Sequence, residues 1–494
     1  MKSIPYFLAF VLFLFLQPVR AQDGDGDEDD PEIEIGEGDG GGDLTEEDED
    51  ELEKIRKKNS GLAGGGRQDD GDDFAPKVKA SLQEQINKAI KAGVKWLKKK
   101  QAPDGSYPPV TASRDYKTKK DIGKRYRDEL APSAWAIYAL AKCGVKKSDP
   151  VLKKGMQYIF DETQYVWDTS GKGKGQFGGH SQRQQPSRAN PRTLTTYEAA
   201  AIVMMIEAVF EQSAKLTRKH KKRRLHTDNP RKLPSRSKIP KKIWRYMHDR
   251  CVYLTVGRRG RPGSKGRTGS PTIPGAQVKQ GGNKGGWRYG PGKGGDADLS
   301  ATQFVLLALR AASQAGYPFD RVARNVWIDA ANYVRKCQKS GGGFTYQITG
   351  GNVTGSMTAC GVGCLVICKE QLELALEYDP EAPRVPSWMD GAIRNGMQWL
   401  DQNFSPANNP GGGHHYYYLY GVERVGDLTG RSEFNQLNWY VRGARFLLKH
   451  QDPDGKWLDA TEAFPPRDVN STSLALLFLK RATPPVVTIS DRDR

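Results

Sequence analysis

Two stretches at opposite ends of the chain share one pattern: residues 93–107 read GVKWLKKKQAPDGSY and residues 443–457 read GARFLLKHQDPDGKW. In both, a glutamine follows five residues after an aromatic residue, and an aspartate–glycine pair begins three residues after the glutamine. Such self-similarity marks a repeat architecture. Weaker copies, each followed by paired glycines, begin near residues 155, 251, 331 and 396.

Each copy continues into a second apolar pattern with helical spacing. We expect these second helices over residues 133–143, 195–210, 299–315, 357–372, 416–425 and 472–480. Many begin with Ser or Thr, which can cap exposed amide groups, and the intervening glycines permit turns that other residues resist. Helical hairpins of this kind bury their faces only against neighbouring hairpins. Six of them can close into a ring or remain an open solenoid.

The aromatic-Leu-x-x-x-Gln-x-x-Asp-Gly-x-aromatic pattern resembles the repeat of squalene cyclases and of protein prenyltransferase β subunits. Residues 285–290 (GGWRYG) and 415–425 (HYYYLYGVERV) are similar to the same superfamily. The resemblance covers residues 76–483 and implies an all-α fold, an α6/α6 toroid (barrel) of six helical-hairpin repeats with a cavity at one end. A shared repeat indicates a fold and says little about a reaction.

The N-terminus has the pattern of a secretory signal, predicted over residues 1–21. Lys2 is followed by an apolar run at 7–16 and by Val19-Arg20-Ala21. The run is shorter than the roughly 20 residues that span a bilayer. A retained anchor or a buried helix is the alternative interpretation. We therefore expect an exported bacterial-type protein, periplasmic or extracellular, with no stable membrane span.

Charge divides the chain into an acidic segment and a basic body. Residues 22–73 carry 22 acidic and 5 basic residues, although the whole chain has a net charge of +18. The segment 22–75 is rich in glycine and nearly free of aromatic residues, which predicts disorder. Basic insertions are expected near 213–245 and 255–286, where a polyanion can bind, and residues 484–494 form a tail.

The sequence Asp296-Ala297-Asp298-Leu299 resembles the Asp-x-Asp-Asp motif of class II triterpene cyclases. The resemblance implies that Asp298 donates a proton with the support of Asp296. Leu299 replaces the last aspartate of the motif. The alternative is that Asp298 or Ser300 caps the helix that begins here.

A metal site is not expected. Asp468-Val-Asn470-Ser471-Thr472 resembles the Asp-x-x-His-Thr zinc motif of protein prenyltransferases, but Ser471 stands in place of histidine. Cys360, Cys364 and Cys368 recur every four residues, which predicts one face of a tightly packed helix; a thiolate metal site is the alternative. No metal and no other cofactor are predicted.

The same resemblance suggests candidates for the lining of the cavity: Trp287, Tyr289, His414, His415 and Tyr416. Neighbouring residues on a helix point about 100° apart, so the two histidines make a poor chelate. The first functional hypothesis is a toroid that binds an apolar or isoprenoid ligand, or a protein, without the complete catalytic motifs of the family. The alternative is a terpenoid (squalene-type) cyclase that uses Asp298 as its proton donor.

The repeat also predicts where its recurring side chains lie. The aromatic residues Trp96, Trp399 and Phe446 should occupy equivalent places and pack between neighbouring hairpins. Gln101, Gln338 and Gln451 should bond backbone groups near the glycine turns; Gln402 is assigned to the same position in a weaker copy of the repeat.

Overall fold

The computed structural model describes residues 80–107, 130–163, 194–210, 238–255, 283–289, 296–317, 321–461 and 467–483. These residues all belong to one compact unit of the chain. The predicted signal, the acidic segment, the tail 484–494 and most of the two basic insertions lie outside the described residues. Residues 241–245, at the end of the first predicted insertion, are helical.

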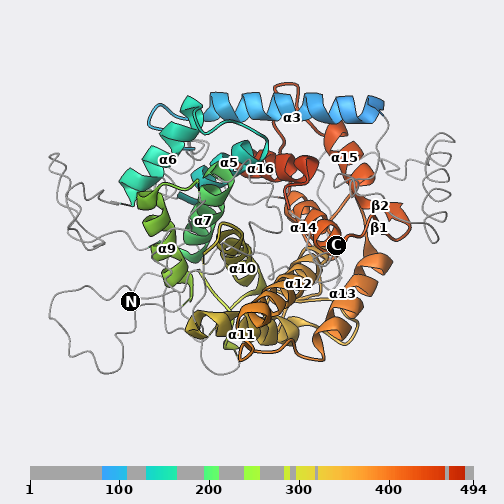
Figure 1. Cartoon of the computed structure of the whole chain (residues 1–494). Coiled ribbons are helices and arrows are strands. Elements are labelled where there is room, and N and C mark those ends of the chain that lie inside the picture. The colour runs from blue at the N-terminus through green and yellow to red at the C-terminus, as the bar shows by residue number, and fades with distance from the viewer. Residues whose placement is uncertain are drawn as a thin grey trace, which may run out of the picture. The chain divides into compact units, whose positions relative to one another are not determined.

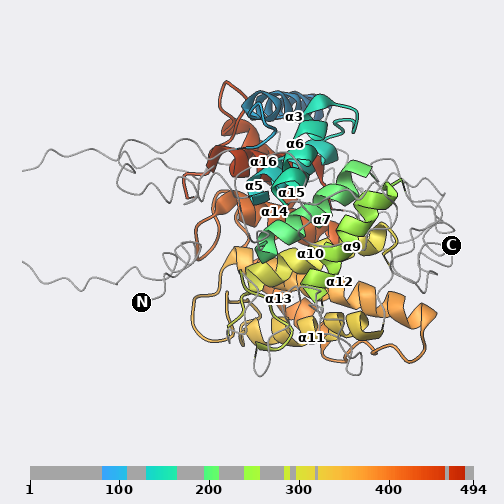
Figure 2. The same cartoon turned by 90° about the vertical axis from the view of Figure 1, so that its left-hand side faces the viewer.

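The described residues form helices in two sets and one short hairpin (Figures 1 and 2). The outer helices are α3 (Ala80–Lys100), α6 (Pro150–Glu162), α9 (Lys241–Thr255), α11 (Arg321–Cys337), α13 (Met389–Asn403) and α15 (Trp439–Lys449). The inner helices are α5 (Leu130–Lys142), α7 (Thr196–Phe210), α10 (Leu299–Gln314), α12 (Gly355–Tyr378), α14 (His415–Thr429) and α16 (Arg467–Lys480). The antiparallel strands β1 (Glu433–Phe434) and β2 (Leu437–Asn438) form the hairpin.

The inner helices pack on one another in a closed cycle. Helix α5 packs on α7, α7 on α10, α10 on α12, α12 on α14, α14 on α16, and α16 returns to α5. The outer helices lie around this ring (Figure 1). The all-α toroid predicted from the sequence is therefore confirmed, and the cyclic packing excludes an open solenoid.

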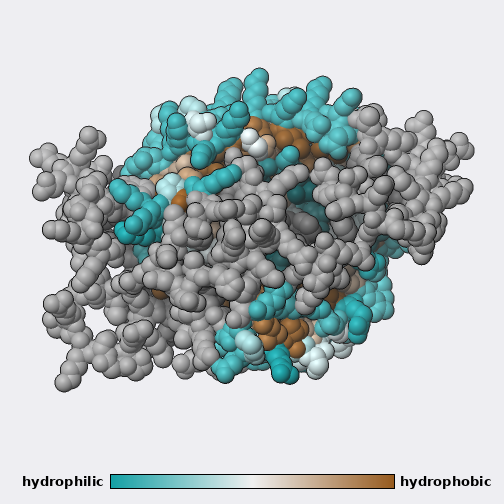
Figure 3. Space-filling model, viewed as in Figure 1, coloured by the Kyte–Doolittle hydropathy of each residue, from teal (hydrophilic) through white to brown (hydrophobic). Residues whose placement is uncertain are grey.

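Burial separates the two sets of helices. In the inner helix α7, every residue except Glu207 is buried, because the helix is covered on all sides. The outer helix α3 buries Leu82, Ile86 and Leu97 and exposes a face rich in lysine. Figure 3 shows this hydrophilic face as the teal edge where α3 lies. None of the described helices is long and apolar enough to span a membrane.

Three repeat glutamines each join an outer helix to its own turn and to the next outer helix. Gln101 Nε2 donates to the carbonyl oxygens of Gly105 and Val151, at 3.1 and 2.9 Å. Gln338 and Gln451 make the same pair of bonds, the latter to Gly455 in its own turn and to Ala89 of α3. The predicted role of these glutamines is confirmed, and the bond from Gln451 to Ala89 closes the ring between α15 and α3.

In four turns, the aromatic residue two positions after the turn glycine anchors the turn to an inner helix. The backbone N–H of Trp457 donates to the hydroxyl of Thr472 at 3.0 Å, and Phe344 donates in the same way to Thr358 at 3.1 Å. Tyr107 and Trp287 make equivalent bonds to Ser133 and Thr302. The Ser and Thr residues expected near the starts of the inner helices therefore hold the glycine turns in place.

Candidate functional site

Asp298 lies immediately before α10 and caps it. Its backbone is extended, and its Oδ1 accepts a 2.7 Å hydrogen bond from the backbone N–H of Ala301. Its Oδ2 accepts a 2.9 Å hydrogen bond from Nη1 of Arg288. The carboxyl group is fully buried. The capping role that was the alternative to proton donation is therefore present.

Arg288 connects Asp298 to tyrosines at this end of the ring. Its Nη1 also donates to the hydroxyl of Tyr346 at 3.0 Å, and its guanidinium lies 4.5 Å from the ring centroid of Tyr289. The two tyrosine hydroxyls are 2.6 Å apart. Asp296 lies at the edge, with 57% of its side chain exposed and an ion pair to Arg288 Nε at 3.1 Å. We call Arg288, Tyr289, Asp298 and Tyr346 the rim cluster.

Burial controls the protonation of the rim cluster. It raises the pKa of Asp298 to about 6, although Arg288 opposes this shift. It also raises the pKa of Tyr289 and Tyr346, and the nearby Asp298 adds to both shifts. At pH 7 the Asp298 carboxyl is therefore mostly ionised, while the phenols remain neutral. Both carboxylate oxygens accept from fixed donors, so this geometry favours an ion-paired cap over a proton donor aimed at a substrate.

Aromatic side chains from the inner helices α5, α7, α10 and α14 contact one another inside the ring. Trp135 of α5 lies edge-on to Phe304 of α10 and Tyr420 of α14, with centroid distances of 5.1 and 6.4 Å. Phe304 also contacts Tyr197 of α7 and Tyr417 of α14, at 5.2 and 6.0 Å. Helix α5 is a neighbour of neither α10 nor α14 in the ring, so these contacts cross its interior.

Hydrogen bonds join the same helices through the hydroxyl of Tyr417. It lies 2.9 Å from Gln303 Nε2, 3.0 Å from Ser300 Oγ and 3.2 Å from Cys360 Sγ. The hydroxyl of Tyr197 donates to Ser300 Oγ at 3.0 Å. Side chains of α7, α10, α12 and α14 are therefore tied together on the inner surface of the ring.

Arg424 of α14 extends this network. Its Nη2 donates a 2.8 Å hydrogen bond to Gln303 Oε1, and its guanidinium carbon lies 4.1 Å from the ring centroid of Tyr420. Its exposed fraction is 2%. We call the interior set the central cluster: Trp135, Tyr197, Ser300, Gln303, Phe304, Cys360, Tyr417, Tyr420 and Arg424.

Part of the central cluster remains accessible to solvent. Trp135, Ser300 and Tyr417 are only partly buried, although each belongs to an inner helix. The rim cluster adjoins this surface, because Tyr289 stacks on Tyr197 at a centroid distance of 5.7 Å. Aromatic surface with a few bonded polar groups is therefore available at the centre of the ring.

The predicted lining residues divide between this region and the walls. Tyr289 belongs to the rim cluster. Trp287 lies in the wall of the ring, where its indole N–H donates to the carbonyl of Leu254 in α9 at 2.8 Å. Its exposed fraction is 1%. The GGWRYG stretch thus supplies a wall residue and, two positions later, a residue near the interior.

The histidine pair lies toward the outer helix α15. The ring of His415 is edge-on to Phe446 at 4.5 Å, and its Nε2 lies 3.0 Å from the carbonyl oxygen of Pro406. Tyr416 contacts the same phenylalanine at 6.3 Å. His414 precedes α14 in a left-handed conformation with φ of 58°. These three residues are apart from the central cluster.

Sequence reasoning missed the residues that occupy the centre. Successive residues of a helix point about 100° apart, so Tyr417 turns inward while Tyr416 faces α15. Three adjacent tyrosines gave no sign of which one does so. Trp135 offered a clearer signal, because it is the bulkiest side chain in an alanine-rich inner helix.

The cysteines pack inside the fold. Cys360, Cys364 and Cys368 are buried on α12, as the packed-helix interpretation predicted, and their thiols are free. Burial raises the pKa of each of them, so they remain thiols near neutral pH. Among the residues that the structure describes, no group of three or more His, Cys, Asp or Glu side chains is arranged to hold a metal ion.

Comparisons with known proteins give similarity at the level of structure alone. No family model and no curated protein matches the sequence. The apo structure of the type II terpene cyclase MstE from Scytonema is similar at a TM-score of 0.43 and 11% identity, covering 81% of this chain and 98% of that one. A variant of MstE in complex with merosterolic acid A has a TM-score of 0.43 and 10% identity, covering 82% and 99%. Similarity at this level assigns no activity to this chain.

Proposed function

We propose that the helical ring binds a largely apolar, isoprenoid-like ligand at the central cluster and performs no chemistry on it. The observation that carries this proposal is Trp135. Its ring contacts side chains from two other helices across the interior, yet part of its surface stays accessible. Binding sites for small molecules are mostly aromatic and apolar, with a few placed polar groups. The central cluster has this composition.

The polar members of the cluster would orient the ligand. Tyr417 and Ser300 are partly exposed, and their hydroxyls are bonded to each other at 3.0 Å. Each hydroxyl can donate or accept, so a ligand with one polar end can exchange a bond with either of them. An apolar chain would lie against Trp135 and Phe304.

The alternative function is cyclisation of an isoprenoid with Asp298 as the proton donor. One observation favours it: burial raises the pKa of Asp298 to about 6. The contacts of the carboxyl oppose it, since Oδ1 accepts from Ala301 and Oδ2 accepts from Arg288. Protonation of an alkene requires an acidic O–H directed at the substrate, and both oxygens are already engaged.

Binding is tested with the purified protein and two neutral probes, geranylgeraniol and squalene, by tryptophan fluorescence and native mass spectrometry. Ser300→Trp would fill the surface between Tyr197 and Tyr417 and should weaken binding by roughly tenfold or more. Ser340→Trp, on an exposed turn, is the matched control and should bind like the wild type. Absence of binding, or equal binding by both variants, would reject the proposal.

Chemistry is tested by incubating the protein with squalene and analysing the products by mass spectrometry. We expect only unchanged squalene. A cyclised product that disappears in Asp298→Asn, in a protein that still folds by circular dichroism, would establish the cyclase alternative instead.

A further inference from the structure

Arg424 is a buried cation without a counter-charge among the described residues. Its Nη2 donates to Gln303, and its Nη1 has no hydrogen-bond partner in the described part of the chain. None of the described carboxylates lies within 4.0 Å of the guanidinium. An unpaired buried charge is unfavourable for folding. Retaining it calls for an explanation other than stability.

The side chains around Arg424 do not supply the missing charge. Burial raises the pKa of Cys360 to about 11 and places the pKa of Tyr417 and Tyr420 well above the usual value. All three are therefore neutral at pH 7. The adjacent Glu423 directs both carboxylate oxygens to Thr483, which donates from its backbone N–H and its hydroxyl at 2.8 Å each.

The guanidinium lies on the inner surface of the ring. Arg424 belongs to α14 and its bonding partner Gln303 to α10, and these helices flank α12. Gln303 in turn donates to Tyr417, the partly exposed tyrosine of the central cluster. Gln303 therefore links the guanidinium to the partly exposed Tyr417.

We propose that Arg424 binds the carboxylate of an amphiphilic ligand whose apolar part lies against the aromatic rings of the central cluster. This inference rests on the proposed function and adds the chemical class of the polar end. Nη1, which has no partner, and Nη2, which bonds Gln303, belong to the same planar guanidinium group. Their N–H groups match the spacing of the two oxygens of a carboxylate. Tyr417 swings away from Gln303 as the ligand enters.

The single positive charge of Arg424 favours a ligand whose head group carries one negative charge. One guanidinium neutralises one carboxylate, whereas a phosphate monoester or a diphosphate would bring at least one further negative charge into a buried site. The described central cluster contains no lysine or second arginine to compensate it. A carboxylate is therefore the expected head group.

The test compares two probes with the same chain, geranylgeranoic acid and geranylgeraniol, by titration with the full-length protein. The acid should bind about 10- to 100-fold more tightly, which is the usual contribution of a hydrogen bond to a charged group. Geranylgeranyl phosphate serves as a third probe and should bind more weakly than the acid.

Two variants remove the free charge in different ways. Arg424→Met deletes it, and Gln303→Glu supplies an internal carboxylate at the 2.8 Å contact. Both should abolish the preference for the acid, so that the acid and the alcohol bind each variant with similar affinity. Neither should lower the melting temperature, because each removes or pairs a buried charge. If one variant fails to fold, the other still decides the question.

The outcomes separate this inference from the function on which it rests. If acid and alcohol bind equally, or if both folded variants keep the preference, the carboxylate site is rejected and ligand binding stands. If the phosphate binds more tightly than the acid, the carboxylate assignment is rejected. If no probe binds, the proposed function fails as well.

Discussion

At the scale of the residue, one glutamine shows how the repeat builds the ring. Gln451 is the last in the chain to bond both its own turn and the next outer helix, and its partner Ala89 lies near the start of the described residues. Its Nε2 therefore bonds across the seam between α15 and α3, where the last and first outer helices of the ring meet. The repeat predicted that Gln451 bonds backbone groups near its turn, and the structure adds the bond to the next outer helix. A glutamine amide carries two N–H donors and can therefore bond both carbonyl groups.

Replacing Gln451 with leucine should lower the free energy of unfolding by about 1–3 kcal/mol, because two partly buried carbonyl groups lose their donor. Denaturant titration measures the change. Gln402→Leu is the control, since Gln402 fits the sequence pattern but is exposed and should cost little. Equal losses in the two variants would show that the seam bond is unimportant.

Gln402, at the corresponding position of a weaker copy, is exposed. In this unit Asn409 bonds the turn: its Nδ2 donates to the carbonyl oxygen of Gly413 at 2.6 Å and to the hydroxyl of Ser356, in the inner helix α12, at 3.0 Å. The aromatic residues Trp96, Trp399 and Phe446 are alike, as predicted: all three are partly buried and pack against the core. Trp457, two residues after a turn glycine, is fully buried. Sequence spacing identifies equivalent positions, but the depth of each one depends on the neighbouring hairpin.

Turn glycines give a second prediction at this scale. Gly342 has φ of +88°, and a Cβ there would lie 2.3 Å from the carbonyl oxygen of Asn395. Gly144 has φ of +87° but open space around it. Alanine at either position should lower the free energy of unfolding by about 1–2 kcal/mol, because its side chain is unfavourable in the left-handed conformation. Gly342→Ala should lose about 1–3 kcal/mol more, because the turn must also move away from α13. Thermal unfolding of the pair measures the difference, and equal losses would contradict the close packing.

At the scale of the element, α14 presents different faces to different surroundings. Its Tyr417 and Arg424 contribute to the central cluster, while His415 and Tyr416 pack on Phe446 of α15. The bounds of the inner helices were largely predictable, since apolar spacing and capping residues are local features. The rotation of a helix about its axis was not, because it depends on which neighbours compete for each side chain.

The packing of α14 on α15 predicts a pH dependence. Burial lowers the pKa of His415 to about 4 from an ordinary value of 6.5. Between these values the unfolded chain binds more protons than the folded one, so stability rises with pH. The stability that depends on a neutral His415 is fully present above about pH 6.5 and is lost as the pH falls toward 4. The free energy of unfolding should fall by about 3 kcal/mol over this range.

His415→Gln keeps a polar side chain but cannot titrate. Denaturant unfolding at pH 7.5 and pH 4.5 should show a smaller loss of stability on acidification in this variant than in the wild type. His450→Gln is the control, because His450 is exposed after α15. An identical loss in His415→Gln and in the wild type would mean that the buried imidazole of His415 does not cause the loss of stability at low pH.

At the start of α10, the resemblance to a catalytic motif and the observed contacts of Asp298 lead to different interpretations. The Asp296-Ala-Asp298 stretch resembles part of a catalytic motif, yet Asp298 caps its helix and pairs with Arg288. Its raised pKa follows from complete burial. A cap at the rim of a ring has the burial and the polar contacts of a functional group without needing to act as one.

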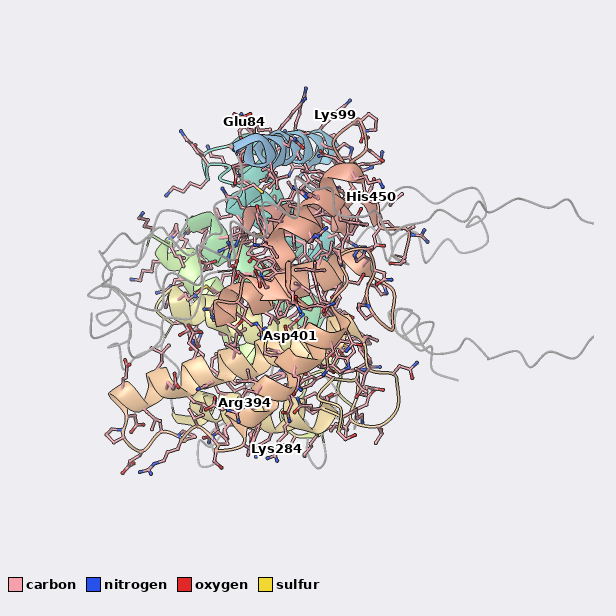
Figure 4. The ribbon with its side chains drawn as sticks, turned by 90° about the vertical axis from the view of Figure 1, so that its right-hand side faces the viewer. Glu84, Lys99, Lys284, Arg394, Asp401 and His450 are labelled. Atoms are coloured by element: carbon pink, nitrogen blue, oxygen red, sulfur yellow. The ribbon has the colours of Figure 1, made fainter. Side chains whose placement is uncertain are left out.

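At the scale of the whole molecule, the toroid was predictable because its repeats recur in the sequence and hairpins of this kind need neighbours on both sides. The outer helices carry the exposed charges: Figure 4 labels Glu84 and Lys99 on α3, and Arg394 and Asp401 on α13. The site was less predictable. Its members come from five inner helices, and no spacing along the chain brings Trp135 near Phe304 or Tyr420.

The central claim is that a ligand binds inside the ring. Photo-crosslinking with a diazirine-bearing geranylgeranyl analogue, followed by mass spectrometry of the peptides, tests it most directly. The label is expected on the inner helices α5, α10 and α14, at or beside Trp135, Phe304 and Tyr417, and excess unlabelled ligand should suppress it. Label confined to outer helices such as α3 or α13, or label that excess ligand fails to suppress, would contradict the account.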